Sequence, residues 1–235
     1  MIIDCIGCLH GQYPKLEGGD LLIVTGDLTA RHTINEIDEF NNWIFNQRYR
    51  KKILIAGNHD DILEMGVFDI NDPQDNTVII DPSCDYLCNS GTEFEYEEDD
   101  IELEECGIHP TVDKSLKIWG TPHSLLFEGV NPRCNAFMGT EEELKKEYDK
   151  IPEGIDILIS HTPPYGILDM NKHGEHCGSI SLRETMFRVK PKYLICSHIH
   201  EQGGKEIDLV MTKVINCSYV NERYQPVNKV MRISL

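Results

Sequence analysis

The chain has 235 residues, of which 40% are hydrophobic, and this is enough for one packed domain or at most two. Its 40 acidic and 22 basic side chains give a formal net charge of −18. Nucleic acids and anionic membranes reward basic patches, so we expect neither as a partner. No apolar stretch is long enough to cross a bilayer, and the first residues lack the basic start of a signal peptide. Together with nine cysteines, an odd number, this predicts a cytoplasmic protein with free thiols.

The first part of the chain alternates predicted strands with a predicted helix. Apolar runs at Ile2–Ile6, Leu21–Thr25 and Lys52–Ala56 are typical of buried strands. Thr33-x-x-Glu36 is a capping box that opens a helix between the second and third runs. Crossovers of this kind build a parallel sheet, so the sequence indicates an α/β fold.

The middle of the chain, residues 76–120, predicts hairpins instead. Short β-like runs at Thr77–Ile80, Thr92–Tyr96 and Leu116–Trp119 are separated by acidic or turn residues. Residues 93–105 hold nine carboxylates and no Lys or Arg, which favours a solvated hairpin or surface loop over a binding element. We therefore expect a single domain over residues 1–235 with an acidic insertion at about 93–113.

The last part of the chain returns to alternating helices and strands. Thr140-x-x-Glu143 predicts a second helix, and Ser181-x-x-Glu184 lies at the start of a third. Buried strands are expected at Ile155–Ile159 and Tyr193–Cys196, followed by an alternating segment from Ile207 to Cys217.

A polar cluster directly follows each of the five buried runs. The carboxyl ends of parallel strands meet at one edge of a sheet, so these clusters are expected to form one site. Their His, Asp, Asn and Cys side chains are ligands for transition metals, and two adjacent metals suit phosphate-ester hydrolysis. The five clusters are Gly7–Gly11, Gly26–Asp27, Gly57–Asp60, Ser160–Thr162 and Ser197–His200.

These clusters resemble the motifs of the calcineurin-like metallophosphoesterase superfamily, which are Asp-x-His, Gly-Asp, Gly-Asn-His-Asp/Glu, His and Gly-His-x-His. Further segments look like the metallophosphoesterase-domain-containing branch, which includes brain-expressed animal proteins. The resemblance implies a four-layer αββα sandwich of two mixed sheets flanked by helices. It also implies hydrolysis of small phosphodiesters or cyclic nucleotides by a metal-bound hydroxide. The segments are Gly120–Ser124, Ser160–Asp169, Gly174–Gly178 and Ser197–Glu201.

The same resemblance implies a role for each site residue. Two divalent transition metals, manganese, zinc or iron, would share the carboxylate of Asp27. His59 would donate a proton to the leaving oxygen, with Asp60 orienting its imidazole. His123 and His176 would lie near the substrate, although either could be a loop histidine without a special role. One metal would be held by Cys8, His10, Asp27 and His200, and the other by Asp27, Asn58, His161 and His198.

Cys8 departs from the superfamily pattern, because an aspartate is usual at its position. A thiolate is soft and favours zinc or iron over manganese, so Cys8 is a ligand that selects the metal, or the chain binds only one metal and Cys8 is a small buried side chain. The departure leaves a catalytically weakened binding or regulatory scaffold as an alternative function. RNA lariat-debranching enzymes also have Cys here, but this short acidic chain makes that activity the least favoured.

Overall fold

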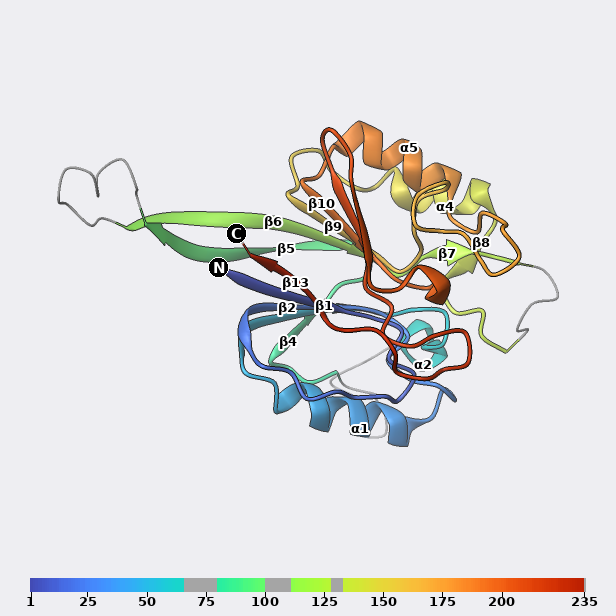
Figure 1. Ribbon diagram of the computed structural model, residues 1–235, viewed down its shortest axis with the longest axis horizontal. Coiled ribbons are helices and arrows are strands. Elements are labelled where there is room, and N and C mark those ends of the chain that lie inside the picture. The colour runs from blue at the N-terminus through green and yellow to red at the C-terminus, as the bar shows by residue number, and fades with distance from the viewer. Residues whose placement is uncertain (66–79, 100–110, 128–132, 235) are drawn as a thin grey trace.

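The computed structural model describes residues 1–65, 80–99, 111–127 and 133–234. Its elements stack in four layers, with two sheets between two helical layers (Figure 1). Helices α1 (Ile34–Phe45) and α2 (Asp61–Glu64) lie on one side, and α4 (Glu141–Tyr148) and α5 (Ile180–Val189) lie on the other. The predicted α/β four-layer sandwich is confirmed.

The first sheet has five strands in the order β13-β1-β2-β3-β4. Strand β13 runs antiparallel to β1 and the others are parallel, so the sheet is mixed. The buried carboxylate of Asp4 on β1 accepts two hydrogen bonds of 2.8 Å from Arg232 on β13, which ties the two ends of the chain together. The strands are β1 (Ile2–Ile6), β2 (Gly19–Thr25), β3 (Tyr49–Ile55), β4 (Cys84–Tyr86) and β13 (Met231–Ser234).

The second sheet has six strands in the order β11-β12-β10-β9-β6-β5. Its four central strands are parallel, and β11 and β5 run antiparallel at its edges. Two short parallel strands, β7 (Ser124–Leu125) and β8 (Met138–Gly139), and the 3₁₀ helix η1 (His200–Gln202) complete the fold. The six strands are β5 (Ser90–Asp99), β6 (Thr111–Thr121), β9 (Ile157–Ser160), β10 (Tyr193–Cys196), β11 (Lys205–Asp208) and β12 (Lys213–Asn216).

The inner strands are buried on both faces, which explains their continuous apolar runs. On β2, Leu21 and Ile23 face the second sheet, while Leu22 and Val24 pack under α1. Successive side chains of a strand point to opposite faces, so one run supplies both contacts. The core therefore lies in three layers, between the two β-sheets and beneath each helical layer.

The two predicted capping boxes are confirmed, and Ser181 lies at the start of the third helix as predicted. Thr33 and Thr140 cap α1 and α4, each with its Glu three residues on. The N-cap of α5 is Ser179, whose hydroxyl accepts from the Leu182 N–H. The Ser181 hydroxyl instead donates to Glu141 on α4, at 2.7 Å.

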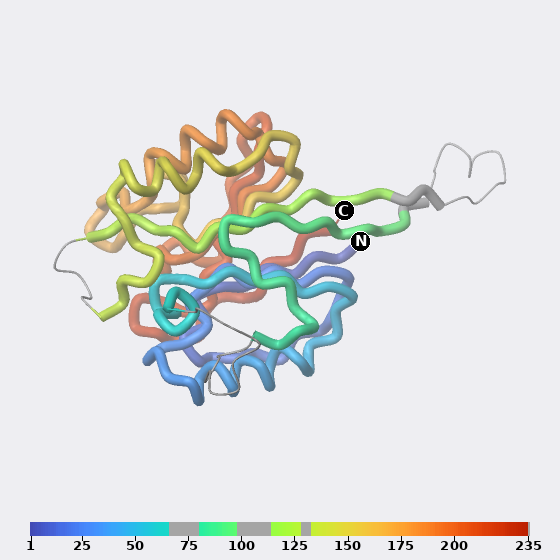
Figure 2. Tube along the Cα trace, turned by 180° about the vertical axis from the view of Figure 1, so that it is seen from behind, coloured from blue at the N-terminus to red at the C-terminus, as the bar shows by residue number. Residues whose placement is uncertain are grey.

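Strands β5 and β6 form a hairpin that projects beyond the body of the molecule (Figure 2). It contains the start of the acidic stretch, whose residues 100–110 lie outside the described part of the chain. The predicted run Thr77–Ile80 also falls largely outside it, at 77–79. Among the described residues, no helix is long and apolar enough to span a membrane.

Candidate metal centre

The five polar clusters meet where β1, β2, β3, β9 and β10 end, and glycines allow the close approach. A Cβ added at Gly7 would lie 1.9 Å from the Thr25 hydroxyl. One added at Gly57 would lie 2.4 Å from the Asp27 carboxylate. Any side chain at either position would push a candidate ligand or its support out of place, so both glycines serve the packing of the site.

The backbone of the site is held in an unusual conformation. Cys8, His10, Asp27 and His198 have φ values of 47°, 45°, 53° and 65°, in the left-handed region that residues other than glycine rarely adopt. Such strain costs about 1–3 kcal/mol per residue and concentrates at functional sites. The turns at these strand ends therefore aim side chains inward at the expense of stability.

One half of the centre contains Asp27, Asn58, His161 and His198. The His161 Nδ1 is 2.8 Å from the Thr25 carbonyl, so this nitrogen carries a hydrogen and Nε2 is the nitrogen available to a metal. Nε2 lies 3.1 Å from the Asn58 Oδ1 and 3.4 Å from the Asp27 Oδ1. The Asn58 amide donates to the Cys134 carbonyl, which keeps its oxygen turned inward.

The other half contains Cys8, His10, Asp27 and His200, whose ligand atoms all lie within 4.8 Å of one another. The His200 Nδ1 lies 3.1 Å from the Asn221 carbonyl, which leaves Nε2 free to accept. That nitrogen is 3.2 Å from the His10 Nε2, which in turn is 3.4 Å from the Asp27 Oδ2. Asp27 thus offers one carboxylate oxygen to each half.

The electrostatics of both halves call for a cation. Burial lowers the pKa of His10 and of His198 to about 3, so both imidazoles are neutral ligands at pH 7. Burial would raise the pKa of Asp27, but the neighbouring imidazoles outweigh it and hold that pKa well below the usual range. Burial would lower the pKa of His161 as well, but the charge of Asp27 outweighs it and raises that pKa, so a metal ion at this position would displace the ring proton. The residues therefore fit divalent metal ions.

Cys8 is fully buried beside Asp27, and its sulfur already has hydrogen-bond donors. The His198 backbone N–H donates to the sulfur at 3.0 Å, and the Ser218 hydroxyl donates at 3.6 Å. Burial and the charge of Asp27 raise the pKa of the thiol well above its ordinary value. The sulfur lies in position to bind a metal, but an ion must first displace its proton.

Asp60 does not lie where it was expected. Its carboxylate accepts from the backbone N–H groups of Leu28, Thr29 and Gly57, at 3.1, 3.0 and 2.8 Å. Burial raises its pKa to about 6. Asp60 therefore braces the loops that carry Asp27 and Asn58, and the predicted contact with the imidazole of His59 is wrong.

The imidazole of His59 is placed by other residues. It stacks on His32, with ring centroids 5.6 Å apart, and meets His10 edge-on at 4.6 Å. Its Nδ1 lies 3.5 Å from the Ala30 carbonyl. His32 is 3.2 Å from the carboxylate of Asp61. His32, Asp61 and the nearby Cys134 lie outside the recognised motifs, so their position beside the site was not predictable from the sequence.

The two candidate substrate histidines separate in the structure. His176 lines a cavity of about 530 Å³ together with Asn58 and His198, and its Nδ1 is 2.7 Å from the buried carboxylate of Asp169. His123 lies elsewhere, with its Nε2 2.9 Å from the Asn89 amide and its Nδ1 3.2 Å from the Phe137 carbonyl. A substrate position remains a prediction for His176, whereas these contacts favour a structural role for His123.

The sandwich and the carboxylate shared by two groups of ligands define a metallophosphoesterase-type centre. The family model of the calcineurin-like phosphoesterases matches residues 1–202, and the chain belongs to this family. This membership supports metal-dependent hydrolysis of phosphoester bonds as its general activity. The predicted resemblance is confirmed at the level of the family.

Two curated relatives are each 32% identical to the chain. One is a UPF0046 protein of Caenorhabditis elegans, aligned over 225 residues that cover 93% of this chain and 56% of the relative. The other is the human metallophosphoesterase domain-containing protein 1, aligned over 242 residues that cover 98% of this chain and 70% of the relative. The chain thus spans little more than half of the nematode protein.

Solved structures share the fold at low sequence identity. The protein TT1561 of Thermus thermophilus has a TM-score of 0.59 and 13% identity, and the match covers 92% of this chain and 88% of the TT1561 chain. The phosphopantetheinyl hydrolase of Mycobacterium tuberculosis has a TM-score of 0.53 and 15% identity, covering 94% and 90%.

Proposed function

We propose that this chain is a metal-dependent phosphodiesterase that acts on small phosphodiesters or cyclic nucleotides. The observation that carries the proposal is the position of Asp27. Its two oxygens each lie 3.4 Å from an imidazole nitrogen of a different ligand group, His10 and His161. A carboxylate in this position suits a pair of metals that share it.

The two groups of ligands described above would each hold one ion. Zinc, iron and manganese all suit this mixture of imidazole and oxygen donors, and a thiolate from Cys8 would favour zinc or iron. When bound, a metal pair neutralises charge on the phosphoryl group and lowers the pKa of a water molecule. His59, beside His10, would give a proton to the leaving oxygen. Asp60 would keep the loops of Asp27 and His59 in register.

The cavity beside the centre supports a diester over a monoester. Its described lining combines imidazole, amide, thiol and apolar side chains with one carboxylate, Glu175. A phosphodiester carries a single negative charge and tolerates such a neutral-to-acidic wall better than a doubly charged monoester does. Its volume of about 530 Å³ lies within the usual range for small-molecule sites. Phe127, Met138 and Ile199 offer apolar surface to a base or an alkyl group.

The test is metal removal and return with a panel of esters. Protein treated with a chelator should lose turnover of bis(p-nitrophenyl) phosphate and regain it with Mn²⁺, Zn²⁺ or Fe²⁺. Diesters and cyclic nucleotides should be cleaved faster than p-nitrophenyl phosphate. The Asp27→Asn variant provides the matched blank for contaminating phosphatases. Faster monoester cleavage would contradict the substrate class, and turnover that survives chelation would contradict the mechanism.

A binding scaffold with weakened catalysis is the second candidate, and the surroundings of Cys8 favour it. The sulfur is fully buried and receives hydrogen bonds from His198 and Ser218, as a structural thiol would. In that case the protein would bind one metal at the half that contains Asn58. Elemental analysis that finds one ion per chain, with no turnover on the ester panel, would favour the scaffold over the enzyme.

A further inference from the structure

A third group of metal-binding side chains lies beside the candidate centre. It consists of His32, His59 and Cys134, and one nitrogen of each ring and the sulfur all lie within 4.8 Å of one another. The two rings lie nearly parallel, at an interplanar angle of 9°, so one ring would turn for both nitrogens to point at the same ion. His59 is buried, while His32 and Cys134 are half-buried, so an ion could reach the group from solvent.

The spacing of one ligand pair in this group, His32 and Cys134, matches a zinc ion. Zinc binds sulfur at about 2.3 Å and imidazole nitrogen at about 2.0–2.1 Å, so two such ligands at tetrahedral angles lie roughly 3.6 Å apart. The His32 Nε2 is 3.6 Å from the Cys134 Sγ. A thiol and two imidazoles also form a donor set that zinc prefers to magnesium or manganese.

The backbone holds two of these ligands in place. His32 has a φ of 60°, in the left-handed region, and this turns its ring toward His59. Cys134 is fixed through its carbonyl, which accepts from the Asn58 amide at 2.9 Å. Asp61 lies 3.2 Å from the His32 Nδ1 at ion-pair distance, although the pair lacks hydrogen-bond geometry. The negative charge of Asp61 on the Nδ1 side would still favour a His32 ring whose Nε2 binds a cation.

We propose that His32, His59 and Cys134 form a third metal site that takes Zn²⁺, with its fourth position open to the cavity that Cys134 lines. On binding, the Cys134 thiol releases its proton to solvent and the thiolate bonds to the ion. The ion would bind the imidazole of His59, which could then no longer donate a proton to the leaving oxygen. Excess zinc would therefore inhibit turnover. This consequence rests on the proposed function, whereas the binding itself does not.

The binding test counts ions and observes the thiolate. Protein loaded with two equivalents of Zn²⁺ is titrated with Co²⁺, whose bond to a thiolate gives a near-ultraviolet charge-transfer band. We expect a third ion and the band in the native protein. Cys134→Ser and His32→Asn should lower the affinity for the third ion at least about 10-fold, because each variant loses a direct ligand. Asparagine tolerates the left-handed φ of His32.

Cys177→Ser is the matched control, since Cys177 lines the same cavity outside this group, and its metal binding should be that of the native protein. The same number of bound ions and the same band in Cys134→Ser and in the native protein would overturn the site, whether the neighbouring centre holds one ion or two.

The consequence is tested by turnover of bis(p-nitrophenyl) phosphate at rising zinc concentration. We expect inhibition of the native protein and of Cys177→Ser, and at least about tenfold more zinc for the same fractional inhibition of Cys134→Ser. Inhibition that is identical in all three proteins would overturn the inhibitory role of the site. A protein without turnover would contradict the proposed phosphodiesterase, while the cobalt titration would still decide the metal site.

Discussion

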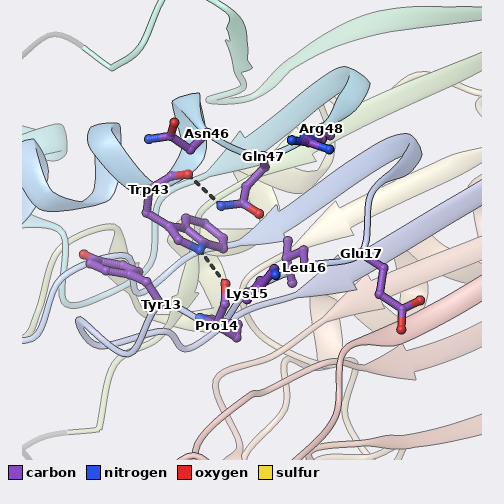
Figure 3. A pocket seen from close by; sticks show the side chains of 9 residues that line it. All are labelled: Tyr13, Pro14, Lys15, Leu16, Glu17, Trp43, Asn46, Gln47 and Arg48. Carbon is purple, nitrogen blue, oxygen red and sulfur yellow. Dashed lines mark hydrogen bonds between the residues drawn. The ribbon is translucent and has the colours of Figure 1, made fainter.

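A surface cavity beside α1 and the metal centre differ in how their polar atoms are paired. The surface cavity, of about 790 Å³, lies between α1 and the segment that follows His10 (Figure 3). There the indole of Trp43 donates to the Pro14 carbonyl and the Gln47 amide donates to the Trp43 carbonyl, both at 2.7 Å. In the metal centre, by contrast, the His161 Nε2 converges with the side-chain oxygens of Asn58 and Asp27, at 3.1 and 3.4 Å. Convergent metal-ligand atoms, rather than volume, distinguish the site for chemistry from a packed surface.

The largest effect should follow from Asp27→Asn. Asparagine keeps the volume, tolerates the left-handed φ and can still accept from the His59 N–H, but it removes the charge that both ligand groups share. We expect metal affinity to fall more than about 100-fold, with loss of turnover. Elemental analysis after dialysis measures this. Unchanged metal content would show that Asp27 binds neither ion.

The next largest effect should follow from His59→Asn. Loss of a general acid costs about 10²- to 10⁴-fold in turnover, while the metals should stay bound. The loss should be smaller for nitrophenyl esters, whose leaving group needs no proton, than for alkyl esters. Rates on a series of leaving groups measure this. An equal loss on every ester would indicate that His59 positions the substrate instead.

His176 and His123 allow a paired comparison. A hydrogen bond to a charged group is worth about 1.5–3 kcal/mol, so His176→Ala should lower kcat/KM by roughly 10- to 100-fold. His123→Ala should change kcat/KM by less than about twofold and lower the free energy of unfolding by about 1 kcal/mol, because its partners Asn89, Phe137 and Glu147 lie away from the ligands. Steady-state kinetics and urea unfolding of both variants measure this. A larger loss of kcat/KM in His123→Ala than in His176→Ala would indicate that the substrate binds near His123.

Cys8→Asp should change the choice of metal more than the rate. An aspartate carboxylate suits manganese better than a thiolate does, so the ratio of Mn²⁺-supported to Zn²⁺-supported turnover should rise. Cys8→Ser is the matched control and should raise that ratio less, since a hydroxyl brings no charge. If neither variant changes the ratio, Cys8 is a packing residue and the site works with the metal at Asn58.

The smallest effect on activity should follow from a change in the surface cavity of Figure 3. Trp43→Phe removes the indole N–H that the Pro14 carbonyl accepts, which should cost about 1 kcal/mol of unfolding free energy. Metal content should stay native and turnover should stay within about twofold. Urea unfolding and kinetics measure the two quantities. A large loss of turnover would break the distinction between the surface cavity and the metal centre.

The sequence predicted the sheets and the gathering of the ligands for a physical reason. Strands such as β2 are buried on both faces, so their apolar runs are continuous and easily recognised. Parallel strands place their carboxyl ends together, which brings Asp27 and Asn58 to one edge without knowledge of any side-chain contact. The family resemblance then supplied the individual roles.

Features that depend on contacts distant in the sequence could not be predicted. Cys134 and His32 meet across 102 positions, and neither stands in a motif. Asp60 follows His59 directly, yet its carboxylate turns away to the loop of Leu28, because that loop presents unpaired N–H groups. Ser181 has the spacing of a helix cap, but its hydroxyl donates a hydrogen bond to Glu141 on the neighbouring helix.

The central claim is that Asp27 joins two metal sites, and anomalous X-ray diffraction from crystals of the zinc-loaded native protein tests it most directly. We predict one peak among Asp27, Asn58, His161 and His198, and a second among Cys8, His10, Asp27 and His200. Each peak should lie in contact with a different oxygen of Asp27. A single peak, or two peaks of which only one touches Asp27, would contradict this account of the centre.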